Sequence, residues 1–334
     1  MLRKFRFFIQ NRFPDVYKKV WRVYSKVKGW RTGERNCQLG VLHSDKKVYI
    51  IRVRKETLGL MGYYMAVLGH IRISKEKGAI PVVDMMNYKN PYLAKKNLGR
   101  KNSWEYYFLQ TNQRISLEEA YKSQQVILSD LETPFEANPR TFYKNIYLNN
   151  QIGKYYDMVR QYIRFTPETK KILDMNYAQI LEPVINQGKK VLGVVSRGTD
   201  ILGFPGHSVQ PSKEQLLDIS QKLMEKYTCD YIFMASDANA SIEFFAEQIG
   251  KEKVLVNKAK RYDVFDKNRV NVLSEIHFER ENDEYLKGIE YLTTIYLLSK
   301  CNVLVGSIVG STIGAICMNC GEYEHVEIID KGVY

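Results

Sequence analysis

The second half of the chain alternates regularly between apolar strand patterns and helical patterns, and no other feature constrains the fold as much. The expected strands cover 191–196, 230–235, 253–256, 302–305 and 324–329, and the expected helices cover 213–227, 239–249, 285–300 and 311–320. Strands that alternate with helices form a mostly parallel sheet with right-handed crossovers. The sequence therefore predicts a Rossmann-like α/β unit in this half.

A shorter strand, helix and strand pattern lies in the first half, and further helical patterns follow it. The expected strands cover 47–53 and 79–84, and the expected helices cover 58–77, 116–129, 154–165 and 167–187. Gly59 and Gly62 stand between the first strand and its helix. A backbone without Cβ atoms can approach a ligand closely there, although tight packing of helix on strand is an equally good explanation.

The pattern breaks at 186–190, and this break is the expected domain boundary. A chain of 334 residues exceeds a usual α/β domain of roughly 100–200 residues, so two domains are expected. We predict a first α/β domain over 36–187 and a second over 188–334, preceded by a basic segment over 1–35.

Most of the net charge of +13 belongs to that basic segment. Residues 1–35 hold eleven Lys and Arg against Asp15 and Glu34, a net of +9, which leaves 39 basic and 35 acidic residues, or +4, elsewhere. A nearly neutral body argues against a nucleic-acid binder. A helix is expected to begin at Pro14, with apolar and aromatic residues on one face and lysines and arginines on the other, which favours binding of 1–31 to an anionic membrane surface. A helix packed on the body is the alternative.

The composition also indicates the compartment. No run reaches the roughly 18 apolar residues that cross a bilayer, and no leader with a cleavage site opens the chain, so we expect a cytoplasmic protein at the inner membrane face. Five cysteines in mostly apolar patterns fit reduced thiols. Cys317 and Cys320 form a single CxxC, a weak metal or redox signal that helix packing explains more simply.

Polar residues follow three expected strands of the second half at the point where each strand ends. Arg197 and Asp200 follow the first, Asp237 the second, and the stretch 306–312 the fourth. The carboxyl ends of parallel strands share one edge of the sheet, and ligands bind there. Arg197 is expected to bind phosphate because its planar guanidinium stays charged. The alternative is a surface turn in which Arg197 pairs with Asp200.

The stretch 306–312 opens the helix expected at 311–320. Backbone amides of its first turn point into the crevice at the strand ends, and Ser311 and Thr312 can either cap the helix or join those amides at a phosphate. With Arg197, and with Asp237 for a ribose hydroxyl or base edge, they predict a nucleoside diphosphate site. No GxGxxG fingerprint follows the first strand of this half, so an NAD enzyme is disfavoured.

These motifs resemble the donor domain of the fucosyltransferase superfamily, which includes the nodulation and core α-1,6 enzymes and, more distantly, the α-1,2 and protein O-fucosyltransferases. Ser196-Arg-Gly-Thr-Asp200 is similar to their His-x-Arg-Arg-(Thr/Gly)-Asp motif, and Gly206-His-Ser-Val-Gln-Pro211 resembles the His-Pro-Ile of the core enzymes. Ala235-Ser-Asp237 and Ser311-Thr312 resemble their Ser/Thr-Asp-Asp and Ser-Ser. The whole chain also resembles small bacterial relatives found with polysaccharide genes.

The resemblance implies a GT-B fold, in which two Rossmann-like domains with parallel sheets face each other across a cleft. The acceptor would bind on the side of 36–187 and the donor in 188–334. It implies metal-independent, inverting transfer of fucose from GDP-fucose, with no cofactor, to a hydroxyl of a surface polysaccharide such as capsule or lipopolysaccharide, or of a lipid-linked glycan precursor. The implied donor contacts are Arg197, Gly198, Thr199, Asp237, Thr294, Gly310, Ser311 and Thr312.

Three positions depart from the family pattern. The family's first histidine falls on Val195, its second arginine on Gly198, and the aspartate of its penultimate helix near Thr294, so the expected guanine contacts are missing. The alternatives are a non-catalytic nucleotide- or glycan-binding protein of the same fold, and a glycosyltransferase that uses another nucleotide sugar.

Inversion needs a base near the acceptor hydroxyl. The candidates are Asp200 and His207 in the second half, followed by Asp84, which ends an expected strand, and Glu105, which lies in an aromatic cluster over 102–108.

Removal of residues 1–30 is expected to abolish co-sedimentation with anionic vesicles and to leave donor binding unchanged. Each Lys or Arg near an anionic leaflet contributes roughly 1 kcal/mol. Salt near ~0.5 M should weaken the attachment, because the screening length of ~10 Å at ~0.1 M shortens further. A full-length protein that stays in the supernatant at low salt would contradict this expectation.

Overall fold

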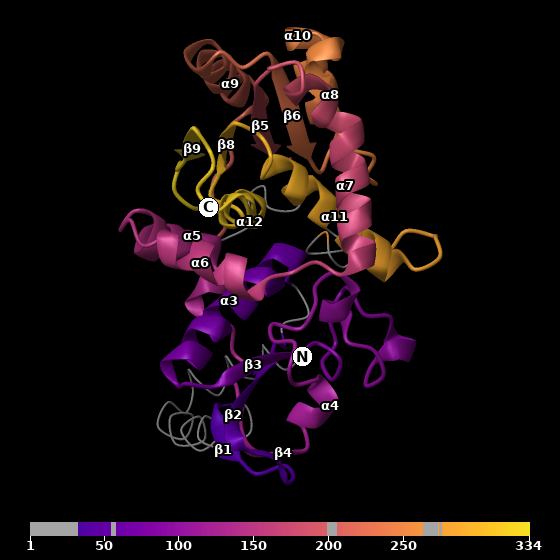
Figure 1. Cartoon of the computed structure of the whole chain (residues 1–334). Helices are drawn as coiled ribbons and strands as arrows, with labels where there is room; N and C mark the ends of the chain where they lie inside the picture. The colour runs from indigo at the N-terminus through magenta and orange to yellow at the C-terminus, as the bar shows by residue number, and fades with distance from the viewer. Residues whose placement is uncertain (1–32, 55–57, 199–205, 263–272, 274–275) are drawn as a thin grey trace, which may run out of the picture.

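The computed structural model describes residues 33–54, 58–198, 206–262, 273 and 276–334, and it shows an α/β protein with two sheets (Figure 1). The predicted membrane-binding segment 1–31 lies outside these residues, as do Thr199 and Asp200. In the part of the chain that is described, no helix combines the length and the apolar character that spanning a membrane requires.

The first sheet contains four strands in the order β1-β4-β2-β3. They are β1 (Arg35–Cys37), β2 (Leu42–Arg52), β3 (Ile80–Asp84) and β4 (Ser123–Leu128). The strands β2, β3 and β4 run parallel, and β1 joins β4 in the antiparallel sense. The helix α3 (Leu60–Glu76) connects β2 to β3, which confirms the predicted strand, helix and strand unit.

The helix predicted over 116–129 is wrong. Only α4 (Leu117–Ala120) is helical, and Ser116 and Glu119 start it with a capping box. From Ser123 the chain is the strand β4, which lies between β1 and β2. The apolar run 126–128 of β4 is buried in this sheet, and a short apolar run fits a buried strand as well as a helix.

The second sheet contains five parallel strands in the order β7-β6-β5-β8-β9. The strands are β5 (Val191–Ser196), β6 (Tyr231–Ser236), β7 (Val254–Leu255), β8 (Val303–Ser307) and β9 (His325–Ile329). Their helices are α9 (Lys213–Tyr227), α10 (Asn239–Ile249), α11 (Asp283–Leu298) and α12 (Gly310–Asn319). Every one of these elements confirms the sequence prediction, with ends that shift by one or two residues at most.

The order of the second sheet determines where a ligand can bind. The chain builds outward from β5 through β6 to β7, then returns to the other side of β5 and continues through β8 to β9. The strand order therefore reverses between β5 and β8. In open α/β sheets the crevice for a ligand lies at this reversal, outside the carboxyl ends of the strands.

Helices from both halves of the chain pack between the two sheets (Figure 1). From the first half, α3, α5 (Pro139–Phe142) and α6 (Gly153–Tyr162) lie between the sheets. The helix α7 (Pro167–Ile180) runs beside the second sheet and alongside α11, and α8 (Glu182–Ile185) follows it there. One hydrophobic cluster includes Tyr49 and Leu68 from the first half and Leu292 and Ile316 from the second. The domain boundary near 187 stays a prediction.

Tyr107 and α11 form a close contact between the two halves. The hydroxyl of Tyr107 donates a hydrogen bond to the carbonyl oxygen of Tyr285 at 3.0 Å, and the two rings stack with centroids 5.7 Å apart. A Cβ atom at Gly288 would overlap the hydroxyl and the ring of Tyr107. Glycine at this position therefore lets the rings of the first half approach α11.

Gly288→Ala is expected to lower the free energy of unfolding by about 1–3 kcal/mol, because an added methyl group forces buried neighbours to move. Chemical denaturation monitored by circular dichroism measures the change. Gly153→Ala is the matched control, since a Cβ atom there meets nothing within 4 Å. If Gly288→Ala leaves the free energy of unfolding unchanged, the contact adapts to the added methyl group without cost.

Candidate functional site

The carboxyl ends of β5, β6 and β8 form one edge of the second sheet. Ser196 at the end of β5 lies opposite Ser236 at the end of β6, and Val195 lies opposite Gly306 of β8. The residues that follow these strands therefore begin at the same edge. Gly306 has to be small here, because a Cβ atom would crowd the hydroxyl of Thr312 and the side chain of Val195.

Arg197 is held at this edge by the neighbouring strand. Its Nε lies 3.1 Å from Oδ2 of Asp237, and the backbone N–H of Gly198 donates to Oδ1 of the same carboxylate at 3.0 Å. The side chains of Arg197 and Asp237 are 19% and 7% exposed. Such a pair fixes the guanidinium before a ligand arrives. It also means that both oxygens of Asp237 already contact protein groups, so a ribose hydroxyl would have to share them.

Tyr262 contacts Asp237 through the backbone. Its backbone N–H donates to the Asp237 carbonyl oxygen at 2.8 Å, and its ring lies 5.2 Å from that of Phe278. Burial raises the pKa of the Tyr262 hydroxyl to about 12, with the carboxylates of Asp283 and Glu290 adding to the shift. The phenol is therefore neutral at physiological pH and can only donate or accept hydrogen bonds.

The helix α12 follows β8, the strand next to β5, and its first turn has two buried hydroxyl groups. Ser311 is 6% exposed and Thr312 is 0% exposed, and neither Oγ of Ser311 nor Oγ1 of Thr312 has a hydrogen-bond partner among the described residues. The helix has no side-chain cap and no acidic residue in its first turn. Capping, the alternative role for these hydroxyls, is therefore not what they do.

Buried polar groups in proteins are almost always paired, and leaving one unpaired costs about 1–3 kcal/mol. Two such hydroxyls at one helix N-terminus mark a place where a partner is missing. The amides of the first turn add donors and a partial positive charge, which suit a phosphate.

The first turn of α3 meets the first turn of α12. The side chain of Met61 lies against Gly310, and at Gly314 a Cβ atom would overlap the Met61 side chain. The helix α3 also lacks a side-chain cap and has no acidic residue in its first turn. A Cβ atom at its N-cap, Gly59, would meet nothing within 4 Å, so packing does not require glycine there. Two helix N-termini therefore lie close to each other.

The remaining predicted site residues of the second half are a donor contact, Thr294, and a candidate base, His207, which both form hydrogen bonds within the protein, and two residues that are not described. The hydroxyl of Thr294 accepts from Nδ2 of Asn257 at 2.9 Å and donates to the carbonyl oxygen of Glu290 at 3.0 Å. His207 is exposed, and its carbonyl oxygen accepts from the N–H of Tyr334 at 3.0 Å. Thr199 and Asp200 lie outside the described residues.

The two candidate bases of the first half have structural partners. Asp84 is 0% exposed, and its carboxylate accepts from the N–H groups of Met86 and Asn87 and from the hydroxyl of Tyr121 at 2.6 Å. Glu105 is exposed and accepts from Gln110 at 2.6 Å. Asp84 therefore stabilises the turn after β3, and a proton transfer by its carboxylate would first have to break these bonds.

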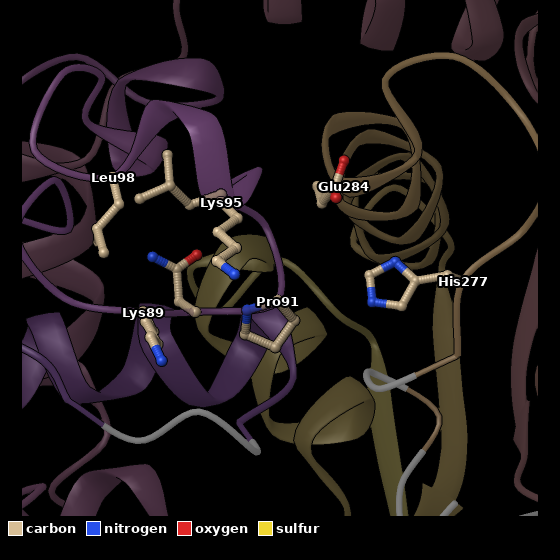
Figure 2. Close-up of a pocket in the computed structure, with 8 residues that line it drawn as sticks. Lys89, Pro91, Lys95, Leu98, His277 and Glu284 are labelled. Carbon is tan, nitrogen blue, oxygen red and sulfur yellow. The ribbon is translucent and has the colours of Figure 1, made fainter.

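Sequence reasoning missed a cavity of about 320 Å³ between the two halves (Figure 2). It is lined by Lys89, Asn90, Pro91, Leu93, Lys95, Leu98, His277 and Glu284. One signal was present in the sequence, because the stretch 89–101 holds five Lys and Arg and no acidic residue. All five cysteines are free, as expected. Among the described residues no group of His, Cys, Asp and Glu could hold a metal ion.

No protein-family model and no curated protein matches this chain. Among solved structures, NodZ α-1,6-fucosyltransferase soaked with GDP-fucose is similar over 82% of this chain and 92% of that chain, at 13% identity and a TM-score of 0.47. Arabidopsis thaliana FUT1 in complex with GDP is similar over 84% and 70%, at 10% identity and a TM-score of 0.48. POFUT1 in complex with GDP is similar over 86% and 75%, at 11% identity and a TM-score of 0.38.

These structures are fucosyltransferases, the superfamily that the sequence motifs resemble.

Thr312→Val is expected to raise the stability of the free protein by up to about 1 kcal/mol and to weaken binding of GDP. The substitution keeps the shape and removes a buried hydroxyl that has no partner, whereas a bound phosphate would lose a donor. Thermal unfolding with and without GDP measures both effects.

Thr293→Val is the matched control. Thr293 is 4% exposed, and its hydroxyl donates to the carbonyl oxygen of Ile289 at 2.7 Å. This control should leave GDP binding unchanged. If Thr312→Val lowers stability and binds GDP normally, the hydroxyl has a structural role.

Proposed function

We propose that this protein is a glycosyltransferase that transfers fucose from GDP-fucose to a hydroxyl of a surface polysaccharide or of a lipid-linked glycan precursor. The proposal includes a GT-B arrangement with the donor in 188–334 and the acceptor toward 36–187. It also includes inversion without a metal or cofactor, at the cytoplasmic face of a membrane.

One observation carries the proposal. The buried hydroxyls of Ser311 and Thr312 have no partner among the described residues, and they stand at the reversal of strand order where Arg197 is also found. A diphosphate matches this set, because its oxygens accept hydrogen bonds from hydroxyls and amides and its charge suits a guanidinium and a helix N-terminus. The sequence motifs at the same positions resemble those of fucosyltransferases.

The same groups fit the chemistry of glycosyl transfer. The acceptor oxygen forms a bond to the anomeric carbon while the bond from that carbon to the β-phosphate oxygen breaks, and the electron pair of that bond stays on GDP. Charge therefore builds on the diphosphate as the sugar leaves. Arg197 and the first turn of α12 would hold this charge most strongly in the transition state. The proton of the acceptor hydroxyl needs a base, for which Asp200 and His207 stay our candidates.

A non-catalytic nucleotide- or glycan-binding protein is the competing function. It would keep the diphosphate contacts and lack turnover. Another nucleotide sugar is a further alternative, because Val195 and Thr294 do not supply the guanine contacts of the family. Val195 is buried in β5 at 2% exposure, and the hydroxyl of Thr294 is bonded to Asn257 and Glu290.

Arg197→Ala is expected to abolish transfer from GDP-fucose while the protein stays folded, because the side chain lies beyond the end of a strand. Losing one charge-assisted contact in the transition state costs on the order of 2–4 kcal/mol. Lys should rescue activity poorly, since an ammonium lacks the planar fork. Release of GDP, with a panel of glycan acceptors, measures the rate.

Arg114→Ala is the control, because Arg114 is exposed and its side chain has no bond to a described residue. GDP at ~100 times its Kd should stabilise the wild-type protein by roughly 2.7 kcal/mol. Turnover of Arg197→Ala near that of the wild type would remove Arg197 from the mechanism. Equal binding of UDP and GDP would end the fucose assignment and leave the glycosyltransferase assignment standing.

A further inference from the structure

The cavity between the two halves is formed by a loop of the first half and the start of a helix of the second, and its lining has a net positive charge. Lys89 and Lys95 come from the loop after β3, and His277 and Glu284 come from the start of α11 and the residues before it (Figure 2). Counting His277 as neutral, the lining has two positive charges and one negative charge. A cavity with this lining favours an anion that also has groups to donate to Glu284.

The lysine-bearing loop is held in shape by a buried asparagine. Asn90 is 8% exposed, its Nδ2 donates to the carbonyl oxygens of Met85 and Tyr88, and its Oδ1 accepts from the N–H of Tyr92 and the hydroxyl of Ser103. These bonds fix the backbone on both sides of Lys89. The backbone position from which the Lys89 side chain extends is therefore set by the fold of the loop.

The cations of this loop form no ion pair with a carboxylate among the described residues. Lys89, Lys95, Lys96, Arg100 and Lys101 are all exposed. In the described part of the chain, the ion pairs of lysines and arginines involve other residues. Five like charges in one short stretch repel each other, and an anionic ligand would relieve that repulsion.

The opposite wall of the cavity is connected to the donor crevice. The hydroxyl of Tyr107 donates to the carbonyl oxygens of Glu284 and Tyr285, which holds the first turn of α11 against the first half. His277 precedes Phe278, whose ring contacts Tyr262, and Tyr262 is bonded to Asp237. The side of the cavity that His277 lines is therefore linked, through Phe278 and Tyr262, to Asp237, the partner of Arg197.

We infer that this cavity is the acceptor subsite and that it selects a saccharide acceptor with an anionic group, either a uronate carboxylate or a phosphate. This inference rests on the proposed glycosyl transfer. Lys89 and Lys95 bind the anionic group, and Glu284 accepts hydrogen bonds from sugar hydroxyls. The shared chemistry of the two anions is what the lysines recognise.

The test uses the full chain saturated with GDP and isothermal titration with three sugars. They are an unsulfated chondroitin disaccharide with a uronate, N-acetylglucosamine 1-phosphate, and neutral chitobiose. We expect at least one anionic sugar to bind at least about tenfold more tightly than chitobiose, which corresponds to roughly 1.4 kcal/mol. The two anionic probes distinguish a uronate from a phosphate.

Lys89→Gln combined with Lys95→Gln is expected to remove this preference, and GDP binding should be unchanged. Lys154→Gln combined with Lys251→Gln is the matched control, because both lysines are exposed and lie outside the cavity. Glu284→Gln should tighten binding of the anionic sugar and leave chitobiose binding unchanged or weaker, because it removes a like charge from the cavity. If these residues had only a structural role, the lysine variant and Glu284→Gln would not change the affinity for the anionic sugar in opposite directions.

Equal binding of anionic and neutral sugars would overturn the inference, and so would a preference that survives loss of both lysines. Inorganic phosphate that competes as well as the sugar phosphate would show an anion site without saccharide recognition, which also overturns it. Failure of GDP to bind would instead count against the proposed function, and this is measured before any sugar is added.

Discussion

The close approach of α3 and α12 is the contact on which the arrangement of this protein depends. Gly310 and Gly314 leave room on α12, and Met61 of α3 occupies it. Each helix follows a strand of a different sheet, α3 after β2 and α12 after β8. The contact therefore joins the two sheets at the carboxyl ends of these strands, which is where open α/β sheets bind ligands.

This packing has an electrostatic cost. Neither helix has a side-chain cap or an acidic residue in its first turn, so two partially positive N-termini lie near one another. The guanidinium of Arg197 adds a full charge, which Asp237 balances at 3.1 Å. Ser311 and Thr312 add two buried hydroxyls, and no hydrogen bond from the described residues offsets the cost of their desolvation. An anionic ligand would stabilise all of these groups together.

Much of this arrangement could be read from the sequence where local pattern and fold agree. The strands and helices from 191 onward have clear periods, and the residues at their ends were found because parallel strands share an edge. The segment 116–129 shows the limit. Its apolar run 126–128 fits a buried helix as well as a buried strand. The pairing of β4 with β1 and β2, which the local sequence does not show, makes it a strand.

The contacts between the two halves could not be predicted from local sequence patterns. Tyr107 meets Gly288 across 181 positions of sequence, and nothing near either residue signals the other. The loop over 89–101 did have a signal, since its five cations stand in a stretch without an acidic residue. Its meaning depends on His277 and Glu284, which the fold brings to the same cavity from the start of α11. The cluster of cations in the sequence indicates an anionic partner, and the fold shows which other residues line the same cavity.

The three positions that depart from the fucosyltransferase motifs have structural surroundings of their own. Val195 is buried in β5, where a histidine would have to desolvate its ring, and Gly198 offers its N–H to Asp237 in place of a second guanidinium. The hydroxyl of Thr294 is used by Asn257 and Glu290. The proposed diphosphate contacts, Arg197 and the first turn of α12, do not involve any of these three side chains. In the proposed site, selection of the base would therefore have to come from other groups, whereas the contacts proposed for the two phosphates would be unaffected by the three departures.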